Sequence, residues 1–349
     1  MLQTPALLIG ALSATIVGAS AQTTVAILCD RDNTLYEDPI GALSNGAGAS
    51  LFVGKTGTNL IRRALVHFDV AGSVPPGARV LSATLSFRIP SLTSGQTASA
   101  HRVLQDWGEG TSVAAGNGGG GASATANDAT WLHRFYPGSP WASAGGDYDP
   151  AQSLSMPLWL GLNVSTPAPG AAADAQFWLD NPGQNFGWLL RNSELAAATA
   201  NRIDSRESGS IALPMMSVTY LVPGTGGFWG LGCPMPFGYY QFQFGGAPIG
   251  GSTIAMQQSN GPANAISALF FALALDAAGT TLAPGCSAYL PFAGMISGPT
   301  VLLDNAGSAS TPFAVPAGFP GYVVVCQAAA LGASPLGFTL SNAGVLCLQ

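Results

Sequence analysis

The sequence predicts an all-β protein with two β-sandwich domains, and three observations lead to this prediction. First, 46 glycines and 25 prolines punctuate the 349 residues, which favours short strands joined by turns. Second, charged residues make up only 8% of the chain, so the charged helix formers Glu, Lys and Arg are scarce. Third, the composition changes near Val222, because all 11 Lys and Arg residues precede Glu207 and only Asp276 and Asp304 are charged after Ser208. The change indicates a domain boundary.

Residues 1–21 are predicted to be a signal peptide. An apolar run over 6–17 is followed by the small-x-small sequence of residues 19–21, after which Gln22 would begin the mature chain. The first five residues contain no Lys or Arg, so an uncleaved apolar N-terminus is the alternative. No later stretch has the 18 uninterrupted apolar residues of a membrane-spanning helix. We therefore expect a secreted or cell-surface protein outside the cell.

The first domain, 22–222, shows strand patterns at regular spacing. An apolar run covers 25–28, and residues 63–70 have apolar side chains at every second position. The clearest strand is 80–89, where polar and apolar residues alternate over ten positions, as on a sheet with one wet face. Residues 100–104 and 217–222 are predicted to be further strands.

Two glycine-rich segments are expected to lack regular structure. Residues 116–128 consist mainly of Gly, Ala, Ser and Asn and are predicted to form a mobile surface loop. Residues 222–227, Val-Pro-Gly-Thr-Gly-Gly, are predicted to be the linker to a second domain, 223–349.

The second domain contains short apolar runs between Gly and Pro, over 265–275, 298–303 and 322–326. The first run is long enough for a buried helix. We favour a strand there, because the surrounding sequence is strand-like and offers no helix caps.

Export would permit disulfide bonds between the five cysteines. Four of them, Cys233, Cys286, Cys326 and Cys347, lie in the second domain and allow three pairings. Proximity in sequence favours Cys233–Cys286 and Cys326–Cys347. Cys29 is then unpaired or bound to one of the others, and its apolar surroundings favour a buried thiol.

Charge and motifs exclude several classes of function. The net charge of −6 leaves no basic patch for nucleic acid. The three histidines occur without a serine-hydrolase elbow, a zinc-protease motif or a nucleotide-binding loop. We therefore predict a protein that is not an enzyme and has no catalytic residues, although two carboxylates would suffice for a glycoside hydrolase, and Tyr and His for a lyase.

Four stretches of the first domain together resemble the DNRLRE family, which is also classed as carbohydrate-binding module family 96. They are Asp32–Tyr36 with Leu51–Gly54, Arg63–Asp69 running on to Leu81–Leu85, Asp106–Gly110 with Ala129–Trp131 and Gly145–Tyr148, and Asn201–Ser208 before Met216–Tyr220. The resemblance covers 24–222 and implies a secreted jelly-roll β-sandwich that binds polysaccharide, in some members alginate. The second domain is similar to C-terminal domains of exported planctomycete proteins, with Gly-Cys at 232–233 and 285–286.

Arginine suits uronate carboxylates because its planar fork binds both oxygens. The predicted carbohydrate-binding residues are Lys55, Arg62, Arg63, Arg102, Tyr136 and Trp141. Lys55 and Arg62 are expected to be exposed. Arg63 and Arg102 could instead pair internally with Glu207, Glu109 or Asp69, an arrangement that we favour for Arg63.

Among the aromatic residues, Tyr136 and Trp141 lie in a Pro- and Gly-rich context and are the favoured stacking residues. Trp107 and Trp131 are expected in the core. For Arg202, Arg206 and Glu207 we favour salt bridges with Asp69 or Asp204 over a role in ligand binding.

No cofactor is predicted, although two acidic clusters could hold a structural calcium ion. One contains Asp30, Asp32, Glu37 and Asp38, and the other Asp147 and Asp149. Neither has EF-hand spacing, so solvated loops are favoured over an ion site.

The sequence thus predicts a polysaccharide-binding protein, with an acidic glycan such as alginate as its partner. The alternative is a structural or cell-surface scaffold that contacts other surface proteins and has no glycan ligand. A polysaccharide lyase is the third interpretation.

Overall fold

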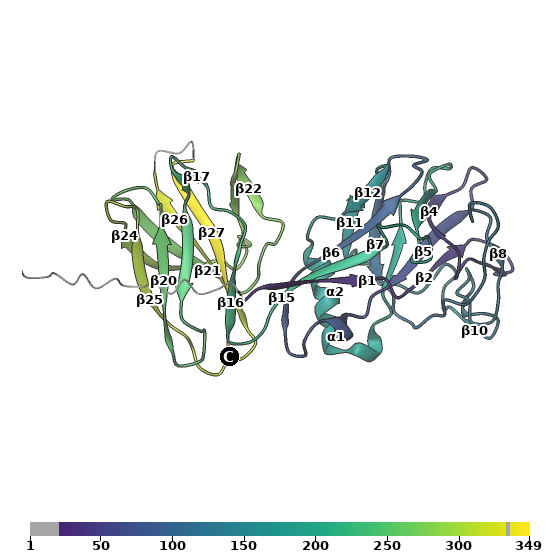
Figure 1. Ribbon diagram of the computed structural model, residues 1–349, viewed down its shortest axis with the longest axis horizontal. Coiled ribbons are helices and arrows are strands. Elements are labelled where there is room, and N and C mark those ends of the chain that lie inside the picture. Colours follow the sequence, from purple (N-terminus) through teal and green to yellow (C-terminus); the bar gives the residue numbers. More distant parts are fainter. Residues whose placement is uncertain (1–20, 333–335) are drawn as a thin grey trace, which may run out of the picture.

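The computed structural model describes residues 21–332 and 336–349, and it is an all-β fold of antiparallel sheets (Figure 1). The predicted signal peptide, apart from Ala21, lies outside the described residues. Before residue 222 the strands are β1 (Thr23–Leu28), β2 (Arg31–Tyr36), β3 (Leu43–Ser44), β4 (Ser50–Lys55), β5 (Ile61–His67), β6 (Arg79–Ile89), β7 (Thr97–Arg102), β8 (Ala122–Ser123), β9 (His133–Phe135), β10 (Ser139–Pro140), β11 (Leu154–Pro157), β12 (Gly161–Val164), β13 (Trp188–Arg191), β14 (Asn201–Asp204) and β15 (Met215–Leu221).

The strands after residue 222 are β16 (Thr225–Trp229), β17 (Pro234–Met235), β18 (Gly238–Tyr239), β19 (Gln241–Gly245), β20 (Thr253–Ser259), β21 (Ile266–Ala272), β22 (Thr280–Ala283), β23 (Cys286–Ala288), β24 (Ile296–Leu302), β25 (Ala309–Ala314), β26 (Val323–Leu331) and β27 (Phe338–Cys347). The helices are α1 (Val70–Ser73) and α2 (Pro169–Asp180), with a 3₁₀ turn at Pro182–Gln184. Neither α1 nor α2, nor any other helix of the described residues, has the length and apolarity needed to cross a membrane.

The first sandwich consists of a sheet in the order β1-β15-β6-β12 and a larger one in the order β11-β7-β13-β5-β4-β14, with β2 added to β5. The strand predicted over 80–89 is confirmed by β6, whereas the face expected to be wet is partly covered, because Ser82 and Ser86 are buried. The β6 residues Ala83, Leu85, Phe87 and Ile89 are buried in the core between the sheets. This core holds the two large sheets at a fixed distance and so positions the loops around them.

Helix α2 was not predicted. It begins with Pro169 at its first turn, where the missing N–H costs nothing, and it packs against β6. Ala171, Ala175 and Trp178 are fully buried in the sandwich core. Its Ala-rich sequence after a proline was the signal that could have revealed it.

The second sandwich has a five-stranded sheet, β16-β27-β26-β21-β24, facing a three-stranded sheet, β19-β20-β25. Phe242, Met256 and Leu269 lie in the core between them. The strand predicted for 265–275 is confirmed by β21. Two hairpins, β17–β18 and β22–β23, complete the fold.

Among the described residues no sheet combines strands from before and after residue 222, yet the two sandwiches touch. Leu81 and Leu221 pack with Val325 and Val345, and Arg79 Nε donates a hydrogen bond of 2.7 Å to the Gly321 carbonyl. The linker predicted at 222–227 is only partly loop, because β16 already begins at Thr225 and pairs with β27.

One of the two predicted disulfides is present. Cys233–Cys286 is confirmed, whereas the prediction of Cys326–Cys347 is wrong, because both thiols are free and buried. In the β26–β27 pair Cys326 lies opposite Gly344, three residues from Cys347, about 10 Å along the sheet. The odd spacing also sends the two side chains to opposite faces. Cys29 is a buried thiol, as expected.

The segment 116–128 is not the free loop that its composition suggested. Ala122–Ser123 pairs with Leu43–Ser44 as β8 and β3. The Tyr36 hydroxyl donates a 2.7 Å hydrogen bond to the Gly118 carbonyl. The segment therefore covers the Tyr36 end of β2.

Candidate functional site

The predicted site residues do not converge on one surface. Arg63 lines a cleft of about 620 Å³, Arg102 lines a pocket of about 230 Å³, and Lys55 and Arg62 line a third pocket of about 220 Å³. Each location therefore has to be judged by whether its cations already have partners.

Arg63 is a structural residue, which corrects its assignment to ligand binding. Its guanidinium binds both carboxylate oxygens of Glu194, at 2.8 and 2.9 Å, and donates to the Gly145 carbonyl at 2.8 Å. It also stacks on Trp131 and Tyr148. Internal pairing was expected, but with a different carboxylate. Arg191 binds the same Glu194 at 2.7 Å, so one carboxylate serves two arginines.

Arg102 is similarly engaged. Its guanidinium lies 3.5 Å from Asp149 and 3.7 Å from Asp174, and it stacks over the Phe177 ring. Asp174 in turn accepts hydrogen bonds from Ser153 and Trp188. This network ties α2 to the larger sheet and leaves Arg102 balanced by two carboxylates.

The prediction of Trp141 as a sugar-stacking residue is wrong. Trp141 is buried in a satellite core with Trp107 and Trp131, and its indole N–H donates to the Thr130 carbonyl at 3.0 Å. The core positions predicted for Trp107 and Trp131 are confirmed. Tyr136 is half-buried, with its ring edge-on to His133 at 5.3 Å.

The pocket at Lys55 and Arg62, which we call the basic pocket, differs from the other two. Phe52, Thr56 and Thr93 also line it. In the described part of the chain neither cation lies within salt-bridge distance of a carboxylate.

Arg62 was expected to be exposed, and this is wrong. Arg62 is only 5% exposed, and its guanidinium stacks on the Tyr36 ring. This burial lowers the pKa of Arg62. Its Nε has no hydrogen-bond partner. The carboxylate of Glu37 acts on Arg62 over a longer range and is already bound to the Ile61 N–H.

Arg202 adds a third cation beside this pocket, which sequence reasoning had assigned to a salt bridge. It lies directly opposite Phe52 in the β14–β4 pair, and its guanidinium donates a hydrogen bond of 3.4 Å to the Asn117 amide oxygen. Its Nε is also buried without a partner. The expected partners are used elsewhere, since Asp204 binds Arg88 and Asp69 caps α1.

A second polar feature is an acidic cluster of Asp32, Glu109 and Glu207. One oxygen from each lies within 4.8 Å of the others. Arg206 binds both oxygens of Glu109, at 2.7 and 2.8 Å, and one oxygen of Glu207 at 2.7 Å. These pairs replace the salt bridges expected with Asp69 or Asp204. Asp32 Oδ1 and Glu207 Oε2 remain buried without hydrogen-bond partners.

The acidic groups proposed for calcium are dispersed. Asp30 pairs with His67, and Asp38 accepts from the Ala42 N–H, so neither joins Asp32. Asp147 accepts from the N–H groups of residues 142 and 143, and Asp149 from that of residue 151. Of these groups Asp32 alone belongs to a carboxylate cluster of the described residues, and Arg206 already binds both oxygens of another member, Glu109.

The buried carboxyls should make stability fall as pH rises. Burial raises the pKa of Asp32 well above its usual range and also raises that of Glu207. The folded state therefore holds the Asp32 proton more tightly than the unfolded state does. The stabilisation is complete below the unfolded pKa of about 3.9 and is lost as pH rises through the higher folded value.

We expect Asp32→Asn to remove this dependence. The amide stays neutral over this pH range, and its oxygen can still accept from the Arg206 N–H. Urea unfolding at about pH 4.5 and 7.5 measures how the free energy of unfolding changes between these pH values. This change should favour the variant over the wild type by at least about 1.4 kcal/mol, the equivalent of one pKa unit. Asp106→Asn, at a half-exposed carboxylate, is the control. Parallel pH profiles for wild type and Asp32→Asn would show the prediction to be wrong.

A scan against models of known protein families matched none of them to this chain, and a search of curated proteins also returned no match. The resemblance to the DNRLRE family therefore stays a prediction, and the function has to be argued from the sites themselves.

Proposed function

We propose that this chain is an extracellular polysaccharide-binding protein that takes acidic glycans at the basic pocket of its first sandwich. The observation that carries the proposal is the set of three cations, Lys55, Arg62 and Arg202, which gather around Phe52 without a salt-bridge partner. Six of the other cations are paired with carboxylates. A uronate carboxylate would supply the missing partner.

The size and lining of the pocket agree with a glycan ligand. At about 220 Å³ it is smaller than the pockets that enclose drug-sized molecules, which suits one sugar unit of a chain lying across the surface. Thr56 and Thr93 offer hydroxyl groups beside the cations. With Arg62 buried, Lys55 and Arg202 are the charges that a ligand would reach first.

Affinity electrophoresis in gels containing alginate, pectate or a neutral glucan tests this proposal. We expect retardation in the acidic gels alone, reduced by added salt. Lys55→Ala and Arg202→Ala should each weaken binding about 2- to 10-fold, as the loss of one partly exposed charged contact does. Arg134→Ala is the matched control, because Arg134 is a half-buried cation of the same domain outside the pocket.

Two results would contradict the proposal. Equal weakening by Arg134→Ala would indicate attraction by net charge rather than by a site. No retardation of the folded protein in any gel would favour the scaffold interpretation.

One observation favours the lyase as a second candidate. Tyr148 lies in the cleft of about 620 Å³, with its hydroxyl hydrogen-bonded to Arg191 and its ring 5.3 Å from His101. However, His101 is buried, and both its nitrogens are engaged, with Ser99 and the Asp149 carbonyl, each at 3.0 Å. Absence of ultraviolet-absorbing unsaturated sugars after prolonged incubation with alginate or pectate would reject this candidate.

A further inference from the structure

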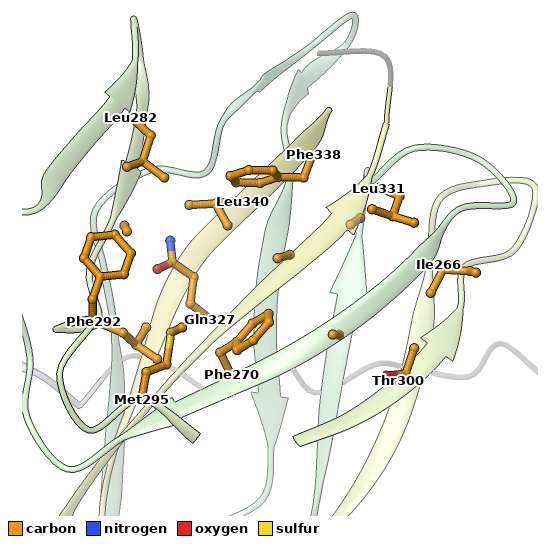
Figure 2. A pocket seen from close by; sticks show the side chains of 15 residues that line it. Ile266, Phe270, Leu282, Phe292, Met295, Thr300, Gln327, Leu331, Phe338 and Leu340 are labelled. Atoms are coloured by element: carbon orange, nitrogen blue, oxygen red, sulfur yellow. The ribbon is translucent and has the colours of Figure 1, made fainter. Parts of the chain in front are cut away.

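The second sandwich contains an apolar cavity of about 480 Å³ on the outer face of its five-stranded sheet, the face turned away from the sandwich core (Figure 2). We call it the apolar cavity. Its lining comes from β21, β22, β23, β24, β26, β27 and the segment between β23 and β24: Ile266, Ala268, Phe270, Leu282, Ala288, Leu290, Phe292, Met295, Thr300, Gln327, Ala329, Ala330, Leu331, Phe338 and Leu340.

The floor of the cavity exists because this sheet is apolar on both faces. Leu269 and Ala328 point into the sandwich core, and their neighbours Phe270 and Ala329 point the other way, into the cavity. A sheet with one wet face would carry polar side chains at these outer positions. Such two-sided apolar strands are typical of a sheet that is covered on both sides.

Part of this outer face is covered by the protein itself. Near the first sandwich, Leu81 and Leu221 pack on it. Beside the cavity, Leu282 of β22, Phe292 and Met295 form a wall along one side (Figure 2). Phe292 remains 58% exposed and Leu331 also 58% exposed, so a recess with apolar walls stays open to water.

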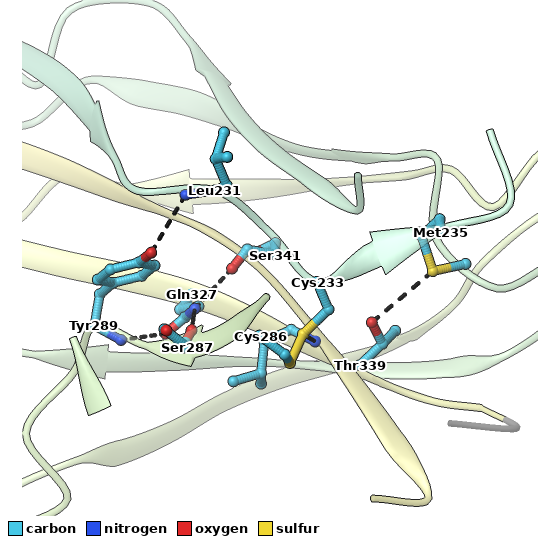
Figure 3. The surroundings of a disulfide bond; sticks show 10 residues. Leu231, Cys233, Met235, Cys286, Ser287, Tyr289, Gln327, Thr339 and Ser341 are labelled. Atoms are coloured by element: carbon cyan, nitrogen blue, oxygen red, sulfur yellow. Dashed lines mark hydrogen bonds between the residues drawn. A yellow bond between two sulfur atoms is a disulfide. The ribbon is translucent and has the colours of Figure 1, made fainter. Parts of the chain in front are cut away.

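The cavity offers almost no hydrogen bonds to a ligand. The Gln327 amide, which lies at its floor, already donates to the carbonyls of Ser287 and Ser341, at 3.0 and 2.6 Å, and accepts from the Tyr289 N–H at 2.9 Å (Figure 3). The Thr300 hydroxyl, on the exposed edge strand β24, is the other polar group of the lining. A ligand with many polar groups would lose its water without compensation.

The cavity also offers no charge. The only charged residues in the sequence after Ser208 are Asp276 and Asp304, and both carboxylates accept hydrogen bonds within turns. A fatty acid anion would therefore find no cation for its headgroup, and the two aspartates would repel it weakly. The chemistry of the site favours an uncharged ligand.

From these observations we infer that the apolar cavity binds one unbranched aliphatic chain of an uncharged molecule, such as a long-chain alcohol or an acylglycerol. The volume lies within the range of small-molecule sites. A slender chain can lie on the apolar floor against the wall of Leu282, Phe292 and Met295, and its polar end can leave past Thr300 into water. The inference concerns the second sandwich and does not depend on the proposed glycan site.

Calorimetric titration of the protein with 1-alkanols from octanol to tetradecanol tests this inference. Each added CH₂ should raise the affinity about fourfold, until the cavity is filled and the affinity stops rising. Dodecanoate at about pH 8 should bind at least tenfold more weakly than dodecanol, because its charge has no partner. No binding of any alkanol, or equal binding of dodecanoate, would overturn the inference.

Two variants place the ligand. Ala329→Trp fills the cavity and should reduce dodecanol affinity at least 30-fold. Ala268→Leu fills it partly, so the affinity should stop rising at a shorter alkanol than in the wild type. Ala314→Trp, at an exposed position of β25 in the opposite sheet, is the matched control and should bind normally. Unchanged binding by Ala329→Trp and Ala268→Leu would place the ligand elsewhere. If the wild type formed dimers and the Ala329→Trp variant were monomeric, the occupant of the cavity would be a second copy of this chain. That result would overturn the inference.

Discussion

Replacing Glu194 by alanine is expected to lower the free energy of unfolding by about 3–5 kcal/mol, the usual cost of leaving a buried ion without its partner. The Glu194 side chain is 7% exposed and that of Arg63 10% exposed, so water cannot replace the lost contact. The substitution also releases Arg191, which binds the same carboxylate. Urea unfolding followed by tryptophan fluorescence would measure the loss.

The matched control is Asp106→Ala, which removes an equally short pair at the surface. Asp106 lies 3.0 Å from Arg31 but is 49% exposed, so the cost should be at most about 1 kcal/mol. The double variant Arg63→Met/Glu194→Met should recover part of the stability, because the buried Arg63 charge is gone and only the more exposed Arg191 has lost its carboxylate. Similar losses for Glu194→Ala and Asp106→Ala would mean that burial does not set the strength of this network.

The same network shows which part of the site could not be predicted from the sequence. Arg63 was expected to pair internally, but its partner Glu194 lies 131 positions away. The backbone of Glu194 has a φ of 55°, which residues other than glycine rarely adopt. No local pattern marks such a residue. The pairing depends on how β13 and the loop after it lie beside β5, which is tertiary information.

Local patterns did predict the strands. The alternation over 80–89 became β6, and the apolar run at 265–275 became β21, because period-2 burial is a property of a strand itself. Side chains near element ends were predicted less well. Arg62 was expected to be exposed, yet the segment around Gly118 and Gly119 covers it, and composition alone could not show that this segment folds back.

Removing the Cys233–Cys286 disulfide is the other change with a large expected effect. The bond closes a loop with a sequence separation of 53, for which the chain-entropy relation gives about 4 kcal/mol of stabilisation. The paired variant Cys233→Ala/Cys286→Ala should lose about that amount in urea unfolding. A paired variant of the free buried thiols, Cys326→Ala/Cys347→Ala, is the control for the loss of packing. It lacks the loop-closure contribution and should cost less.

The disulfide should also matter for the apolar cavity, because of where it lies. Cys286 begins β23, and the bond fastens the β22–β23 hairpin to Cys233, which directly precedes β17 (Figure 3). This hairpin carries Leu282 and Ala288, two lining residues. Without urea, and at a temperature where the paired variant stays folded, we therefore expect it to bind dodecanol more weakly than the wild type does. The reason is that the disulfide no longer fixes one wall of the cavity. Full stability loss with unchanged alkanol affinity would show that two hydrogen bonds of the Gln327 amide, donated to the Ser287 carbonyl and accepted from the Tyr289 N–H, hold the wall without the disulfide.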